Sequence, residues 1–146
     1  MSLEQVFSIA GGVAMIGWLV LLLAPAGSAW PGRVVYSAAV ALAMLYAALI
    51  GAYFSRSQGG FGSLADVAVL FATPGVLLAG WVHYLVFDLL VGSWERSEAD
   101  RLALSRFVLA PCLLLTFLLG PLGWLLFLAV RHVRMRAQLV RGSSPA

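Results

Sequence analysis

The fold of this chain is constrained most by a succession of apolar runs. Each run is close to or above the length needed to cross a bilayer as a helix. A membrane-spanning helix needs about 17 to 25 apolar residues, whereas a membrane-spanning strand would show about ten residues of alternating polarity. No such alternation occurs. The sequence therefore predicts an all-α fold, a four-transmembrane-helix bundle in a single transmembrane domain over residues 1–146. The expected spans cover residues 6–23, 34–54, 66–92 and 107–130, with a polar C-terminal tail over 131–146.

The composition excludes an ordinary soluble domain. Charged residues make up 10% of the chain and hydrophobic residues 62%, whereas about a quarter of a soluble domain is charged. The first run carries Glu4 and no basic residue before it, so we expect a retained helix rather than a signal peptide. Four arginines gather in the C-terminal segment, which is typical of a cytoplasmic membrane flank and not of a nucleic-acid-binding protein. We therefore expect a multi-pass protein of a bacterial inner membrane, with both termini in the cytoplasm.

Two irregularities are expected along the spans. Pro74 interrupts the third run, and because proline lacks the amide proton it predicts a kink or a short break there. The charged segment 95–106 holds Ser97 and Asp100 in capping-box spacing. This spacing predicts a short interfacial helix between the third and fourth spans.

His83 and Asp88 are the only histidine and the only carboxylate that the apolar runs contain at depth. A charged group at the bilayer centre costs about 2.5 to 3.5 kcal/mol on insertion scales, so such groups usually mark a site. On a regular helix the two side chains lie about 140° apart. Either they face two neighbouring grooves, or the irregularity after Pro74 and a partner helix bring a ligand between them.

The estimated depths of the polar residues in the membrane place them in one layer of the expected bundle. At about 1.5 Å per residue, counting from the expected span ends places Cys112 near the level of Asp88 and Thr116 near that of His83. Burial favours the neutral forms of both an acid and an imidazole, so the two could work as an acid/base pair. We therefore take His83 and Asp88 as candidate catalytic residues. The candidate substrate-binding residues around them are Trp81, Tyr84, Cys112 and Thr116.

The competing interpretation is structural. In it, Asp88 neutralises Arg101 or Arg106 of the adjacent segment, while His83 donates to a carbonyl, and both hold helices together. No cofactor or metal is expected, since the ligand spacings of zinc sites are missing. A haem on His83 is a minor alternative, and we do not expect His132 as its second ligand, because it lies roughly 20 Å away along the membrane normal.

Several short motifs resemble those of a known family. They are Trp81-Val82-His83, Phe87-Asp88-Leu89, Pro111-Cys112-Leu113, Thr116-Phe117 and Gly120-Pro121-x-Gly123. The chain resembles the abscisic-acid-deficient-four family of small four-helix membrane proteins, whose plant members are required for neoxanthin synthesis. The match is clearest over about 64–127. It implies a carotenoid or related isoprenoid as substrate and an isomerisation, since opening an epoxide and removing a proton to leave an allene requires no redox cofactor.

For such a reaction our own hypothesis, which the resemblance does not supply, takes Asp88 as the candidate acid toward the epoxide oxygen and His83 as the candidate base. Whether the chain is an enzyme stays open. The alternative is a non-catalytic carotenoid- or lipid-binding accessory subunit of a membrane complex, and a transporter ranks third. The expected partners are a lipophilic small molecule, membrane lipids and a second copy of the chain in a homo-oligomer.

Overall fold

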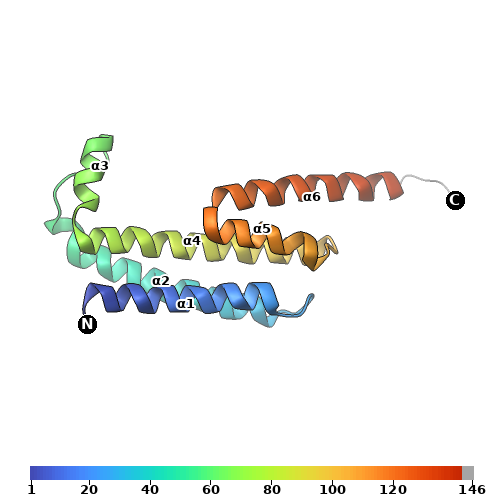
Figure 1. Ribbon diagram of the computed structural model, residues 1–146, viewed down its shortest axis with the longest axis horizontal. Coiled ribbons are helices and arrows are strands. Elements are labelled where there is room, and N and C mark those ends of the chain that lie inside the picture. The colour runs from blue at the N-terminus through green and yellow to red at the C-terminus, as the bar shows by residue number, and fades with distance from the viewer. Residues whose placement is uncertain (143–146) are drawn as a thin grey trace.

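The computed structural model describes residues 1–142, and these form helices without any strand (Figure 1). The all-α prediction is therefore confirmed. The helices are α1 (Leu3–Leu23), α2 (Trp30–Tyr53), the short 3-10 helix η1 (Phe54–Arg56), α3 (Leu64–Phe71), α4 (Pro74–Arg101), α5 (Arg106–Leu119) and α6 (Pro121–Gly142).

Three helices are long and apolar enough to cross a membrane: α1, α2 with η1, and α4. They lie side by side in Figure 1, with α4 packed against both α1 and α2. The four-span prediction is corrected at the last run. This run forms α5, which has 14 residues and is shorter than a span, and the beginning of α6.

The last run is divided because the chain reverses at Gly120 and Pro121. Gly120 adopts φ +40°, a conformation that favours glycine, and Pro121 begins α6. Helix α6 then runs back along α5 (Figure 1). The two helices approach closely, since a Cβ on Gly123 would overlap the backbone of Thr116. The result is a helical hairpin whose tip lies beside the middle of α4.

The expected break at Pro74 is confirmed, because α3 ends at Phe71 and α4 begins at Pro74, with α3 leaving the line of α4 (Figure 1). The expected interfacial helix over 95–106 is wrong. Residues up to Arg101 continue α4 instead, and a short turn follows in which Ala103 has φ +50°. The charged side chains did not end the helix because several of them are buried against neighbouring helices.

Two arginines bind the C-terminal end of α1. The Arg96 guanidinium donates hydrogen bonds to the carbonyls of Leu21 (2.5 Å), Ala24 (2.9 Å) and Pro25 (2.7 Å). Arg106 also donates to the Ala24 carbonyl, at 2.6 Å. The last carbonyls of a helix lack partners within it and form the negative end of its dipole. These cations therefore join α1 to α4 and α5.

The N-terminal end of α1 and the C-terminal end of α6 lie at opposite ends of the molecule (Figure 1). With three candidate spans instead of the expected four, the structure favours termini on opposite sides, and the sidedness of the termini stays a prediction. Most arginines lie toward the end where α4 finishes, whereas Arg56 follows α2 at the other end. An excess of arginine marks the cytoplasmic side of a membrane protein.

This arrangement predicts that the α2–α3 loop and the last turns of α6 face opposite sides of the membrane. Gln58→Cys and Ala137→Cys, each placed in a Cys112→Ser chain, should react with a membrane-impermeant maleimide from opposite sides of oriented vesicles. Ala137→Cys should react from the cytoplasmic side. Labelling of both from one side would show that the last run crosses as a single helix.

Candidate functional site

Helix α4 carries three buried carboxylates that face the hairpin, and two of them, Asp88 and Glu95, bind no arginine in the described residues. Asp88 is 9% exposed and Glu95 is 0% exposed. Within the described residues, Oδ2 of Asp88 and Oε2 of Glu95 are buried without a hydrogen-bond partner. Buried polar atoms are nearly always paired, and unpaired ones are costly in a membrane, where no water replaces the missing partner. Both carboxylates are therefore candidates for a functional role.

Asp88 lies against the tip of the hairpin. A Cβ on Gly120 would be 3.1 Å from its Oδ1 atom, so the small residue leaves room for the carboxyl. Tyr84, one turn before Asp88, is close enough to interact with it. The Tyr84 hydroxyl also donates to the Phe117 carbonyl at 3.2 Å. The tip of the hairpin and one turn of α4 thus enclose a phenol and a carboxyl together.

Glu95 is a buried polar residue that the sequence analysis did not select. The Thr116 hydroxyl donates to its Oε1 atom at 2.9 Å, and the Cys112 thiol lies near the same carboxylate. Along the axis of α4, Thr116 and Cys112 therefore lie beside Glu95, and not beside His83 and Asp88 as expected. The expected register was wrong by about two turns because α4 continues past Trp94 to Arg101.

A simple pattern could have identified Glu95. It follows Asp88 by seven residues, and at about 100° per residue such positions lie on the same face of a helix. It was assigned to the interfacial segment because charged neighbours follow it. Continuing the helical face beyond Trp94 would have placed both carboxylates in one row.

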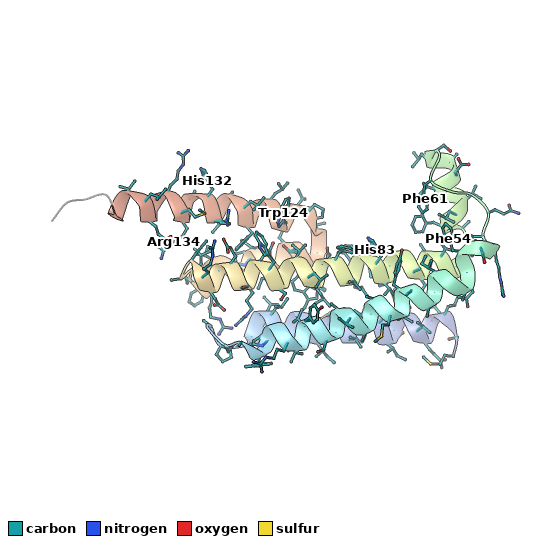
Figure 2. All side chains as sticks on the ribbon, turned by 180° about the vertical axis from the view of Figure 1, so that it is seen from behind. Phe54, Phe61, His83, Trp124, His132 and Arg134 are labelled. Atoms are coloured by element: carbon teal, nitrogen blue, oxygen red, sulfur yellow. The ribbon has the colours of Figure 1, made fainter. Side chains whose placement is uncertain are left out.

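His83 lies on a different face of α4 from Asp88. Its ring centroid is 5.6 Å from that of Tyr46 on α2 and 4.6 Å from that of Phe87. It lines a groove of about 330 Å³ formed by α2, α3 and α4, toward the end where Phe54 and Phe61 lie (Figure 2). The structure therefore keeps the two side chains on separate faces of α4 and does not bring them to one groove.

Trp81 lies on the same face of α4 as Asp88, two turns earlier, in a groove shared with α1. Its ring centroid is 5.7 Å from that of Phe7 and 5.4 Å from that of Tyr84. The groove has a volume of about 350 Å³ and is lined mainly by apolar side chains, with Glu4 at the start of α1. Trp81 lines this groove, its ring contacts that of Tyr84, and Tyr84 interacts with Asp88, so side-chain contacts link the groove to the hairpin tip.

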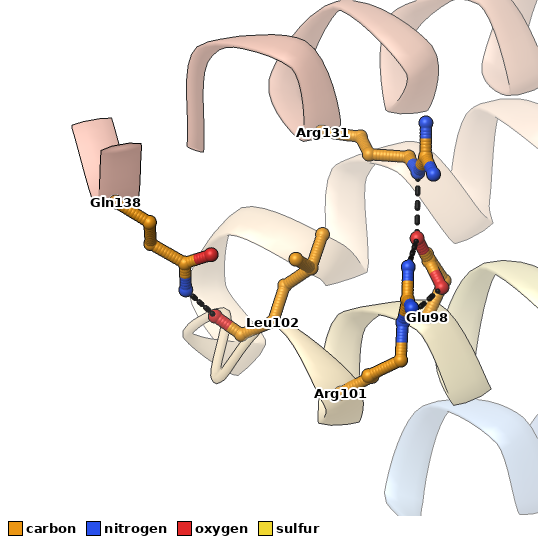
Figure 3. A network of polar contacts seen from close by, with 5 residues as sticks. All are labelled: Glu98, Arg101, Leu102, Arg131 and Gln138. Carbon is orange, nitrogen blue, oxygen red and sulfur yellow. Dashed lines mark hydrogen bonds and ion pairs between the residues drawn. The ribbon is translucent and has the colours of Figure 1, made fainter. Parts of the chain in front are cut away.

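Arg101 and Arg106, which the structural interpretation pairs with Asp88, bind other groups. Glu98 accepts hydrogen bonds from Arg101 at 2.7 Å and from Arg131 of α6 at 2.6 Å (Figure 3). Arg106 binds carbonyls of α1. Neither Arg101 nor Arg106 pairs with Asp88 within residues 1–142, so the expected neutralisation is absent there.

The described residues contain no group of three or more His, Cys, Asp or Glu side chains placed to hold a metal ion. His83 lies on α4 and His132 on the far part of α6 (Figure 2), so the two imidazoles do not form the axial pair of one haem. A haem bound by His83 alone stays a minor prediction.

The comparisons with known proteins give one match. A family model described as ABA DEFICIENT 4-like matches residues 5–127. No curated protein and no solved structure matches the chain. The matched range contains every residue that the sequence analysis selected for the site.

The close approach of α5 and α6 predicts that Gly123→Ala destabilises the protein by roughly 1 to 3 kcal/mol, since overpacking forces a backbone shift. The matched control is Gly11→Ala, because a Cβ at Gly11 meets nothing within 4 Å. That change should leave stability unchanged or raise it by up to about 1 kcal/mol. Denaturant titration in mixed micelles measures both, and equal stabilities would contradict the close packing.

Proposed function

Since the chain belongs to the ABA DEFICIENT 4-like family, we propose that it is a membrane-embedded isomerase that opens an epoxide on a carotenoid or related isoprenoid. The observation that carries the proposal is the Asp88 carboxyl. It is 9% exposed, has an oxygen without a partner in the described residues, and lies two turns of α4 beyond Trp81, which lines an apolar groove. Ionisable groups in such positions usually have a functional role.

The groove beside α1 suits a lipophilic substrate. Its walls are mainly apolar side chains of α1 and α4, including the rings of Phe7 and Trp81. An isoprenoid chain can lie along these walls, with its oxygen-bearing ring directed toward Tyr84 and Asp88. Small-molecule sites are commonly apolar grooves with a few polar groups that fix the orientation of the ligand.

One carboxyl can perform the whole isomerisation. Neutral Asp88 gives its proton to the epoxide oxygen, and the C–O bond breaks with its electron pair on that oxygen, which becomes a hydroxyl. The carboxylate then takes the proton from the neighbouring vinylic carbon, and the C–H electrons form the new double bond of the allene. Asp88 ends protonated, and the reaction consumes no oxidant or reductant.

The aromatic side chains near Asp88 have a role in this scheme. Opening the epoxide leaves positive charge on carbon, and the faces of aromatic rings attract cations. Trp81 and Tyr84 have ring centroids 5.4 Å apart, and Tyr84 interacts with Asp88. The Tyr84 hydroxyl is held by the Phe117 carbonyl, so we assign Tyr84 to positioning of the carboxyl and the substrate.

The scheme changes the role expected for His83. The sequence analysis paired it with Asp88 as the base, but its imidazole faces the groove between α2, α3 and α4. Asp88 therefore serves as acid first and as base second, and His83 takes no part in the proton transfers.

A cell that accumulates violaxanthin provides the test. Expression of the chain should produce the allenic isomer, and Asp88→Asn should lower its formation at least about 100-fold, as expected for loss of a general acid. Asp100→Asn near the end of α4 is the matched control and should retain activity. Pigments are followed by chromatography, with folded protein verified in detergent by size exclusion.

Two outcomes contradict the proposal. An unchanged pigment profile with folded wild-type protein would remove the isomerase claim for this substrate. Equal activity of wild type and Asp88→Asn would remove the assigned role of Asp88. If the purified chain retains carotenoid without converting it, the accessory-subunit alternative explains the result better.

A further inference from the structure

The groove between α2, α3 and α4 contains two polar groups without hydrogen-bond partners. The Tyr46 hydroxyl and the His83 imidazole both line it, and neither makes a hydrogen bond within residues 1–142. Tyr46 comes from α2 and His83 from α4, with ring centroids 5.6 Å apart. We infer that this groove is a second ligand site, which binds the ring-shaped, oxygen-bearing end of a lipid-soluble molecule.

The walls of the groove favour a flat ring. Phe54 and Phe61 are stacked, with ring centroids 6.1 Å apart and planes inclined by 17°. Phe71 of α3 also lines the groove. Aromatic rings pack well against other planar groups. An acyl chain would contact these walls as well, but it would offer nothing to Tyr46 or His83.

Helix α3 closes the groove on one side because α4 has a glycine there. A Cβ on Gly80 would be 2.5 Å from Cε1 of Phe71, so the ring of Phe71 lies directly on the α4 backbone. The groove has a volume of about 330 Å³. This volume is at the lower limit for small-molecule pockets, and it suits a single ring rather than a whole isoprenoid.

The membrane environment predicts that the ligand carries an oxygen atom that can pair with Tyr46 or His83. A polar group in hydrocarbon has no water as an alternative partner, so an unsatisfied donor or acceptor is costly. A hydroxyl or oxo group on the bound ring would accept from the Tyr46 hydroxyl or bond to the imidazole of His83. The site lies on another face of α4 from Asp88, so it does not depend on the proposed function.

Two carotenoids of equal length test the inference. Zeaxanthin carries a hydroxyl on each ring and β-carotene carries none. The full chain in nanodiscs should bind zeaxanthin about five-fold more tightly, as expected for one net hydrogen bond. His83→Phe and Tyr46→Phe should each reduce this preference, and the double variant should abolish it. Affinities come from titration followed by pigment absorbance.

Two controls separate this site from others. Tyr36→Phe makes the same change on α2 at an exposed position and should keep the preference. Asp100→Asn should also keep it, because that carboxyl lies at the far end of α4 and outside the groove. The measurement is binding and not conversion, so a failed isomerase test leaves this result interpretable. Tyr46→Phe removes a single oxygen and therefore preserves folding even if His83→Phe does not.

Equal affinity of the wild type for the two carotenoids would overturn the inference, as would an unchanged preference in the Tyr46→Phe, His83→Phe double variant. Loss of the preference in Asp100→Asn would also overturn it, because that carboxyl lies outside the groove.

Discussion

In hydrocarbon each polar group must find its partner within the protein, and this constraint governs the arrangement of the helices. The end of α1 leaves carbonyls that its own helix cannot pair, and Arg96 and Arg106 bind them. Those same contacts fix where α4 ends and α5 begins. Because α5 starts at that level, its Thr116 meets Glu95 and its C-terminal glycine meets Asp88. The position of the candidate site therefore depends on the capped end of α1.

Helix α4 is the element around which both grooves are built. One groove opens between α4 and α1 at Trp81, whose ring contacts Tyr84, the neighbour of Asp88. The other opens between α4, α2 and α3 and presents Tyr46 and His83. In each groove a few polar side chains lie among apolar walls, an arrangement that favours lipid-soluble molecules with a polar end. The two grooves differ in chemistry, since one ends in a carboxyl and the other in an imidazole and a phenol.

Hydropathy and proline position were enough to predict the class, the approximate spans and the break at Pro74. They could not predict the reversal at Gly120, because residues on both sides of it are equally apolar and only the backbone conformation changes. The buried Glu95 was missed for a related reason. Its neighbours are charged, and the sequence alone does not show that Arg96 and Glu98 find partners within the protein. The angle between His83 and Asp88 was predictable, but which groove each would face was not.

The hairpin also affects how molecules reach the protein. Helix α5 has 14 residues, so it rises roughly 21 Å, less than the roughly 30 Å of the hydrocarbon core. Beyond its tip, the early turns of α4 have no hairpin helix beside them (Figure 1). With α1, α2 and α4 as the spans, that flank faces the leaflet at the end where α4 begins. A lipid dissolved in that leaflet can diffuse in without passing the headgroups, whereas one in the opposite leaflet must first flip.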